Sequence, residues 1–551
     1  MTVRTRSRLL RGVALACALA LVGAACGSSK KSASSTTGVA ATTTAVATTA
    51  PATTAGGTGT SGATGTSGAT DTSGATDTSG ATATSGATAT SGATATSGAS
   101  TGTAGCPAID ASVDKNAGIG AGLSMSDITC GGTKALKAQG DPIVIGFQNP
   151  EGDPNGDFPE FSVAAKAAVD YINNELGGLG ADVQNGKAGR PIQLEVCKMA
   201  ITPDDSQRCA NELLTKKPFA VFSSINFFGN QFPIYAAAKT PVIVITPITV
   251  GDFTSPGVYS IGGGGGCLGA HTGLVKFVTS NLKAKKVGIP WADTPPGVVC
   301  YYDLEAKPMD VLNGKVKGSS SAAGSIPDLT YLGVPIKPAT PDVTPEVTQI
   351  LDFKPDAIMF SAQGADCWNL VNGLGRLGWK PDAIPLVMSG SCIDFAAMKA
   401  AGDLAKGVYF VGSSGSLLND PKTITDPLDK FEAITYQTKG KQYGLDATNL
   451  TKGFATQGFT GLMSLWELSS QIVVKGDQLT PESLEKAYAG TDNQHTFGSS
   501  PLSCSKAPTP YVAVCNSVVS ATKWDGTQLV PVVPRFSGID LVAGTVIKPG
   551  P

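Results

Sequence analysis

The side chains able to do acid–base, nucleophilic or cofactor chemistry are few and scattered along the chain. His271 and His495 are the only two histidines, and neither has a catalytic motif around it. The run Gly373–Gly378 matches GxGxxG, but it follows a helical pattern, whereas a dinucleotide site needs a strand before its first glycine. An enzyme would also need a nucleophile and a base placed together. We therefore expect a protein without catalytic activity and without a cofactor.

The cysteines have the pattern of an exported protein that is cross-linked by disulfides. Of 12 cysteines, Cys17 lies in an N-terminal apolar run and Cys26 follows that run, which leaves an even number in the rest of the chain. No CxxC motif occurs and histidine is scarce, which disfavours a metal site. Sequence alone does not fix connectivity. The spacing suggests that neighbours pair in chain order: Cys106–Cys130, Cys197–Cys209, Cys267–Cys300, Cys367–Cys392 and Cys504–Cys515.

The N-terminus has the layout of a lipoprotein signal peptide. Four arginines precede the apolar run 13–22, which is too short to span a bilayer. Small residues then precede Cys26, as in the bacterial lipobox, where that cysteine becomes the lipidated first residue. The alternative is an ordinary cleavage site beside an incidental cysteine. We expect residues 1–25 to be the signal peptide and Cys26 to carry a membrane anchor.

Low complexity marks the next segment. Within residues 26–105, a six-residue unit, Thr-Ser-Gly-Ala-Thr-x, repeats from Thr60 to about Thr101, and its largest aliphatic side chain is alanine. Such a sequence buries too little apolar surface to fold, so we expect a disordered linker spanning roughly 50 Å. Residues 106–140 form a Gly-rich extension that the Cys106–Cys130 bridge would close.

From Asp141 onward, short apolar runs alternate with helical patterns. Strand-like runs occur at 142–147, 192–196, 219–222 and 241–246, and a second series occurs at 286–289, 331–334, 357–360, 386–388 and 407–411. Helical patterns separate them, for example at 161–176, 203–214, 269–282 and 366–377. This alternation predicts an α/β fold with two doubly wound parallel sheets and hence two lobes. Ligands of such sheets bind beyond the carboxyl ends of the strands, so two facing edges make a cleft.

The order of these pieces resembles the branched-chain amino-acid binding family, which has the type I periplasmic-binding-protein fold of ABC importers. The resemblance covers about residues 141–530. It rests on Ile143–Asn149, Ala164–Asn173, Glu195–Cys197, Val242–Pro247, Lys354–Phe360 and Leu374–Gly378, taken in order.

The resemblance implies that the chain crosses between the lobes three times. Lobe 1 would hold residues 141–261 plus 412–500, and lobe 2 would hold residues 262–411 plus 501–551. The glycines of 262–266 and the stretch 411–415 would then lie near the hinge, where they suit a change of backbone dihedrals. A plain flexible loop is the alternative for the five glycines.

The resemblance also implies a ligand site. In amino-acid binders, backbone N–H and hydroxyl groups after the third and fourth strands hold the ligand's α-carboxylate. Here the Phe227–Phe228 pair would make an apolar wall, unless these rings plug the core. A lobe 2 acid that pairs with the ligand ammonium is replaced by Ser391 or Gly390, with Asp394 nearby, which favours an apolar, aromatic, amide-like or carboxylate ligand at least as much as an amino acid. The ligand-binding candidates are Asn226, Phe227, Phe228, Gly229, Asn230, Ile248, Thr249, Trp291, Gln363 and Ser391.

These observations together predict an extracytoplasmic, lipid-anchored solute-binding protein that delivers a small amino-acid-like, amide or carboxylate ligand to an ABC permease. A sensory receptor module that signals to a membrane partner is the alternative. The formal net charge is −2 and no basic stripe is evident, so nucleic acid is not an expected partner. We expect a monomer.

Overall fold

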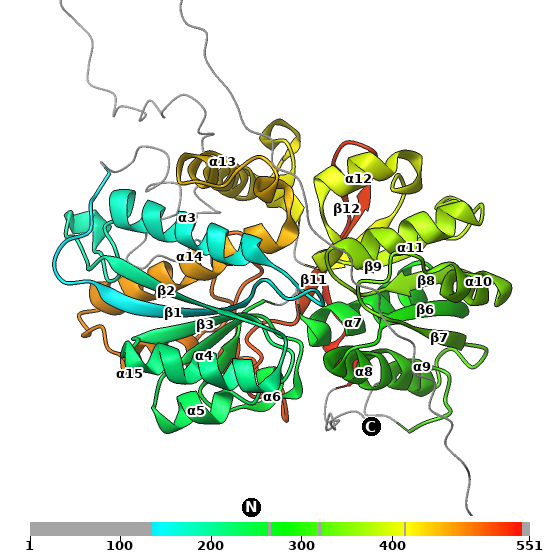
Figure 1. The fold of residues 1–551 in the computed structure, drawn as a ribbon, viewed down its shortest axis with the longest axis horizontal. Helices are drawn as coiled ribbons and strands as arrows, with labels where there is room; N and C mark the ends of the chain where they lie inside the picture. The colour runs from blue at the N-terminus through cyan, green and yellow to red at the C-terminus, as the bar shows by residue number, and fades with distance from the viewer. Residues whose placement is uncertain (1–134, 263–265, 318–321, 413–414, 543–551) are drawn as a thin grey trace, which may run out of the picture. The chain divides into compact units, whose positions relative to one another are not determined.

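Two β-sheets, each covered by helices on both faces, carry the fold (Figure 1). The computed structural model describes residues 135–542, apart from 263–265, 318–321 and 413–414. The expected signal peptide, lipidated Cys26, the linker and the Cys106–Cys130 bridge lie outside the described residues. None of the described helices is long and apolar enough to cross a membrane.

The first sheet is parallel throughout, with the strand order β2-β1-β3-β4-β5. Its side chains alternate between two cores, as a strand covered on both faces requires. In β4, for example, Ile243 and Ile245 face one core and Val242 and Val244 face the other. The strands are β1 (Ile143–Pro150), β2 (Ile192–Met199), β3 (Ala220–Ile225), β4 (Val242–Thr246) and β5 (Val258–Ser260).

Helices α3 and α14 pack together over one face of the first sheet, beside α13, while α4 and α5 cover the other face (Figure 1). Several of these helices begin at signals that the sequence carries: Thr202 caps α4, and Pro203 occupies its first turn. The helices of this lobe are α3 (Pro159–Glu175), α4 (Pro203–Thr215), α5 (Phe232–Ala237), α6 (Val250–Thr254), α13 (Pro427–Gln442), α14 (Gly453–Val474) and α15 (Pro481–Ala489).

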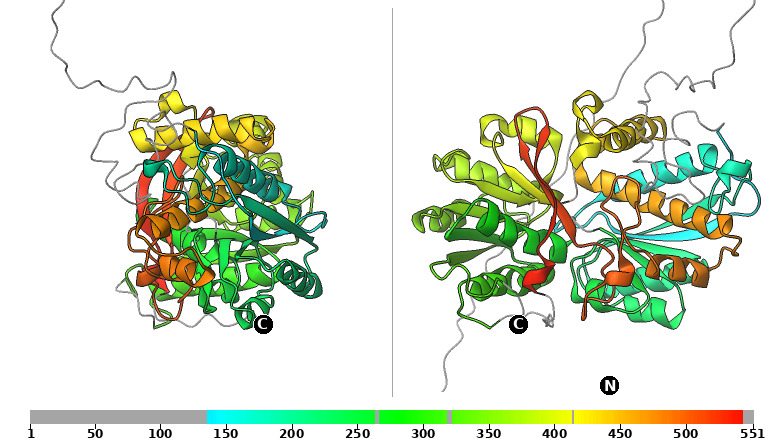
Figure 2. Two further views of the ribbon diagram at one scale, coloured as in Figure 1. Left: turned by 90° about the vertical axis from the view of Figure 1, so that its left-hand side faces the viewer. Right: turned by 180° about the vertical axis from the view of Figure 1, so that it is seen from behind.

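The second sheet has the strand order β12-β11-β10-β9-β8-β6-β7. Its central strands are parallel, as the sequence predicts, but β11 pairs antiparallel with both β10 and β12, which the sequence analysis did not foresee. The last two strands run behind the lobe as a hairpin (Figure 2). The strands are β6 (Lys286–Ala292), β7 (Thr330–Ile336), β8 (Ala357–Phe360), β9 (Leu386–Ser389), β10 (Tyr409–Gly412), β11 (Val518–Trp524) and β12 (Leu529–Ser537).

Two further cores lie on opposite faces of this second sheet. One is formed with α10, α11 and α12, and the other with α7, α8 and α9. These helices are α7 (Cys267–Lys276), α8 (Pro295–Tyr301), α9 (Lys307–Leu312), α10 (Thr344–Asp352), α11 (Ala365–Arg376) and α12 (Phe395–Ala401).

The chain passes between the two lobes three times: after β5, after β10 and before β11. The last passage comes after residue 515, because Ala513 and Cys515 still hydrogen-bond to Ser260 at the end of β5. The sequence-based boundary at residue 501 is earlier than this. At the first passage, Gly262 and Gly266 lie so close to the backbone oxygens of Ile245 and Pro247 that a side chain at either glycine would overlap them.

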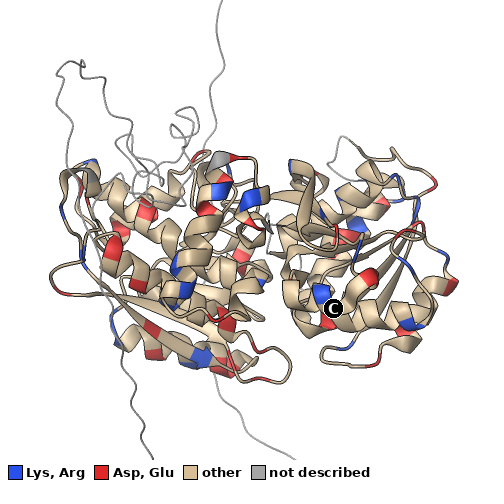
Figure 3. Cartoon of the chain, turned by 90° about the horizontal axis from the view of Figure 1, so that it is seen from above, with Lys and Arg blue, Asp and Glu red and all other residues tan. Residues whose placement is uncertain are grey.

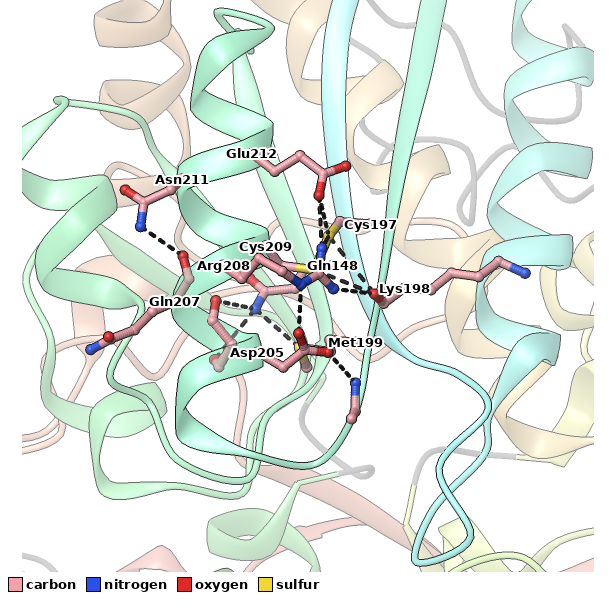
Figure 4. The surroundings of a disulfide bond; sticks show 12 residues. Gln148, Cys197, Lys198, Met199, Asp205, Gln207, Arg208, Cys209, Asn211 and Glu212 are labelled. Atoms are coloured by element: carbon pink, nitrogen blue, oxygen red, sulfur yellow. Dashed lines mark hydrogen bonds and ion pairs between the residues drawn. A yellow bond between two sulfur atoms is a disulfide. The ribbon is translucent and has the colours of Figure 1, made fainter.

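Four of the predicted disulfides fall within the described residues, and all four are present: Cys197–Cys209, Cys267–Cys300, Cys367–Cys392 and Cys504–Cys515. Figure 4 shows the first of them, which ties the end of β2 to α4. Beside it, Arg208 bridges Asp205 and Glu212 with N···O distances of 2.5 and 2.8 Å.

Candidate ligand-binding site

A cavity of about 520 Å³ lies where the strand-end loops of the two lobes meet. The first lobe contributes the loops that follow β3 and β4, and the second lobe contributes the loop after β6 and the start of α8. We call this the aromatic pocket. Its lining residues are Phe227, Phe228, Thr249, Val250, Gly251, Asp293, Thr294, Pro295, Pro296, Val298 and Val299.

A second cavity of about 400 Å³ is also lined by both lobes. It joins the loop after β1 and the start of α14 to the loops that follow β8 and β9. We call this the acidic pocket. Its lining residues are Asp157, Phe158, Glu160, Gly364, Ala365, Trp368, Asn369, Ser391, Cys392, Ile393, Asp394, Ala397, Lys452, Gly453 and Phe454.

Of the predicted site residues, Phe227, Phe228 and Thr249 line the aromatic pocket and Ser391 lines the acidic pocket. Phe227 is 5% exposed, and it both lines the cavity and belongs to the core of the first lobe. Phe228 is only partly buried, which leaves part of its ring toward the cavity.

Asn226 lies beneath the pocket wall and is fully used by internal hydrogen bonds. Its side-chain oxygen accepts from Ser223 and Gln231, each at 2.6 Å. Its side-chain nitrogen donates to Asp252 Oδ1 at 2.8 Å. Because Asn226 is 1% exposed, it holds the loop after β3 in place and does not present its amide to the cavity.

Asp252 is the centre of this buried network. Its Oδ2 accepts from the backbone nitrogens of Ile248 and Thr249 at 2.8 and 2.7 Å, and the Thr249 hydroxyl caps α6 by accepting from the Asp252 nitrogen. Complete burial raises the pKa of Asp252 to about 6, although the hydrogen bonds from Thr249, Asn226 and Ile248 act to lower it.

Three other predicted residues make contacts within the protein that hold the loops after β3 and β4 in place. The Asn230 side chain donates to the Pro203 carbonyl at 2.9 Å. Gly229 has a positive φ of 76°, and its Cα faces the Thr249 hydroxyl so closely that an added Cβ would lie 3.0 Å from it. The Ile248 side chain is 8% exposed and packs into the first-lobe core.

The structure places Trp291 in the core of the second lobe and not in either pocket. Its ring stacks on Tyr301 with a centroid distance of 5.0 Å and an interplanar angle of 4°. The cause is strand alternation, since this position of β6 faces the α8–α9 side of the sheet. Gln363, at the end of β8, is half-buried and lines neither pocket.

The acidic pocket contains groups that the sequence analysis missed. Glu160 and Lys452 form an ion pair across α3 and α14 at 3.4 Å, and burial raises the pKa of the Glu160 carboxyl. Trp368 is 7% exposed, and its indole nitrogen has no hydrogen-bond partner within the described part of the chain. Ser391 donates to the Ala362 carbonyl at 2.6 Å.

Position along the chain explains why these residues were missed. The loop after β1, with Asp157 and Phe158, is a carboxyl end of a parallel strand like the others, so the strand rule alone would have included it. Lys452 and Phe454 belong to the start of α14, which follows no strand, and no sequence signal brings them to the cleft.

Two other features of the described residues carry less weight as sites. A larger cavity, about 840 Å³, lies within the second lobe at the starts of β9 and β10, away from the other lobe. Near the first passage between lobes, His271 lies within 4.8 Å of Cys267 and Cys300, but both sulfurs are in a disulfide and so offer no thiolate to a metal.

Comparison with known families identifies the chain. The family model described as periplasmic binding protein matches residues 142–492, which is more than half of the sequence, so the chain belongs to the periplasmic binding protein family. No curated protein matches the sequence.

Solved structures share this fold at low sequence identity. A solute-binding protein of an ABC transporter from R. palustris, in complex with 4-hydroxybenzoate, is 17% identical with a TM-score of 0.53, covering 72% of this chain and 97% of that chain. A branched-chain amino-acid ABC transporter protein from Thermus thermophilus, with bound valine, is 14% identical with a TM-score of 0.57, covering 74% and 98%. A fatty acid ABC transporter substrate-binding protein from Thermomonospora curvata is 16% identical with a TM-score of 0.55, covering 76% and 97%. These likenesses establish the two-lobed fold.

Proposed function

We propose that this chain is the extracytoplasmic solute-binding protein of an ABC importer and that it binds a small organic ligand between its two lobes. The observation that carries the proposal is the pair of pockets, each lined by strand-end loops from both sheets. A ligand held there contacts both lobes at once, so binding favours their approach, which is the signal that a permease reads.

The relatives support the class of ligand and leave its identity open. Their named ligands are 4-hydroxybenzoate, valine and fatty acid, all small organic molecules with an apolar part. The aromatic pocket suits an apolar part, because two phenylalanines, three valines and two prolines line it. In this proposal the protein binds its ligand and releases it chemically unchanged.

The proposal also includes the way in which the protein reaches its transporter. Cys26 carries the lipid anchor, residues 26–105 act as a spacer, and the folded part, with lobes of 141–261 plus 412–515 and 262–411 plus 516–551, works as a monomer at the outer face of the membrane. The membrane partner is an ABC permease.

A thermal-shift screen tests the proposal. The Cys26→Ala chain is screened against amino acids, amides, amines, short carboxylates and aromatic acids, because a ligand that binds only the folded form raises its melting temperature. For any ligand found, Phe228→Ala weakens binding by at least about tenfold, since it removes part of the pocket wall.

The matched control is Phe219→Ala. Phe219 is also a partly buried ring against the first-lobe core, but it lines neither pocket, so its removal leaves the affinity unchanged. Equal weakening by both variants would contradict binding between the lobes. Closure on ligand without any stimulation of transport would favour a sensory receptor.

A further inference from the structure

The backbone donors at the end of β4 are already occupied by the protein's own carboxylate. The N–H groups of Ile248 and Thr249 both point to Asp252 Oδ2, at 2.8 and 2.7 Å. Asp252 is 0% exposed, so a ligand cannot reach these two donors without displacing a buried side chain. These two donors are therefore closed to a ligand carboxylate in the cleft.

The two serine hydroxyl groups beside these donors are also in use. Ser223 donates to the Asn226 side chain at 2.6 Å, and Ser224 donates to the Asn149 side chain. Both serines are 0% exposed. The Thr249 hydroxyl accepts from the Asp252 nitrogen. These two serines are thus unavailable to a ligand, and the first-lobe wall of the aromatic pocket is largely apolar, with Phe227, Phe228 and Val250 in it.

The charges that line both pockets are predominantly acidic. Asp293 is the single charged side chain of the aromatic pocket, and the acidic pocket has Asp157, Glu160 and Asp394 against Lys452. Lys452 is paired with Glu160. Among the described residues, Asp157, Asp293 and Asp394 form no ion pair. Elsewhere acidic and basic side chains are interspersed over both lobes (Figure 3), so this excess of carboxylates is local to the pockets.

We infer that the cleft of this chain selects an apolar ligand that has no carboxylate: an uncharged one such as an amide, or a cationic one such as an amine. The internal carboxylate of Asp252 occupies two backbone donors that a ligand carboxylate could use, and the acidic side chains that form no ion pair repel a ligand anion while they attract a cation. The indole N–H of Trp368, which has no partner among the described residues, suits a carbonyl oxygen on such a ligand. This inference rests on the proposed function and narrows its ligand class.

Probes of nearly equal shape test the inference directly. Benzoate, benzamide and benzylamine differ in one group, as do leucine and leucinamide. Their affinities for the Cys26→Ala chain are measured by calorimetry at concentrations up to about 10 mM. We expect at least one of benzamide, benzylamine and leucinamide to bind at least about tenfold tighter than its carboxylate counterpart.

A charge-reversal variant provides the second measurement. Asp293 is exposed, so Asp293→Lys is expected to fold, to weaken the binding of the amine probes and to strengthen that of benzoate, each by at least about threefold. The control is Asp352→Lys, which makes the same charge change at an exposed residue of the second lobe outside all three cavities and leaves all affinities unchanged.

Each outcome decides the question. Carboxylates that bind as tightly as their amides or amines, or an Asp293→Lys variant that behaves like its control, overturn the inference. Failure of all five probes to bind also overturns it, while the proposed function stands if another solute binds and Phe228→Ala weakens it. Binding that Phe228→Ala leaves unchanged overturns the proposed function itself.

Discussion

Buried carboxylates are the chemically distinctive residues of this protein. Asp252 and Glu467 are both 0% exposed, and burial is the main cause that raises the pKa of each. The two carboxylates differ in the number of hydrogen bonds that they accept. Asp252 accepts hydrogen bonds at both oxygens, whereas Glu467 accepts one from the Phe497 nitrogen at 3.1 Å and its Oε2 has no partner among the described residues. Glu467 is therefore the costlier of the two to ionise.

Glu467→Gln should stabilise the protein at neutral and alkaline pH. A carboxyl whose pKa is higher in the folded than in the unfolded state gives full stability below the unfolded value of 4.5, and this stability falls as pH rises toward the folded value. Glutamine imitates the protonated form at every pH. We expect the melting temperature at pH 8 to rise by about 2 to 4 °C and that at pH 4.5 to change little.

Calorimetry at the two pH values checks this expectation. The control is Asp477→Asn, which neutralises an exposed carboxylate just beyond the same helix and should leave both melting temperatures unchanged. A Glu467→Gln variant that is less stable than the parent at pH 8 would mean that the folded protein uses the ionised carboxylate.

At the level of single residues, sequence predicted the loops better than the directions of their side chains. Phe227, Phe228, Thr249 and Ser391 line the two pockets, because the carboxyl ends of parallel strands share one edge. Trp291 could not be placed, since one residue of register decides which face of the sheet a strand residue covers. Nor could Asp252 be found, because its partners come from two loops that only the tertiary fold brings together.

The packing of α3 against α14 depends on the absence of a side chain at one position. A Cβ at Gly458 would lie 2.4 Å from the Phe161 carbonyl oxygen, which is backbone and does not move aside easily. Gly461, on the same helix, would place a Cβ 3.1 Å from the Ile245 Cδ1 methyl, which can rotate. A substitution at Gly461 can therefore serve as the control for the same substitution at Gly458.

Gly458→Ala should destabilise the protein by about 1 to 3 kcal/mol, because it forces the two helices apart. Gly461→Ala should be nearly neutral, since about 1 kcal/mol of gained helix propensity offsets a small side-chain adjustment. Guanidinium unfolding midpoints measure the difference. Equal midpoints for the two variants would show that α3 and α14 are not in backbone contact at Gly458.

At the level of elements, the alternation of strand and helix patterns predicted most of both sheets. All nine predicted strand segments lie within or overlap observed strands. Three strands were missed, β5, β11 and β12, and two of them have a clear physical reason. β5 has only three residues, too few for a periodic signal. β12 contains two prolines, which demote a run as a strand candidate and which an edge strand tolerates.

On the scale of the whole molecule, the predicted anchor is separable from the folded part. Cys26→Ala should move the protein from the membrane fraction to the soluble fraction, because the acyl chains attach to that cysteine. Fractionation of cells followed by immunoblotting measures the shift. Cys17→Ala is the control and should leave the protein with the membrane, since Cys17 is removed with the signal peptide. Retention of the Cys26→Ala protein at the membrane would contradict lipid anchoring.

The interleaved path of the chain has a consequence for the order of synthesis. The core of the first lobe combines Ile143 with Tyr511 and Val514, and the second sheet draws its last two strands from residues 518–537. Neither lobe can complete its core until almost the entire polypeptide has been made. Contacts between such distant positions close slowly, so the newly made chain stays incompletely folded until its final segment arrives, and the two lobes then mature together instead of one after the other.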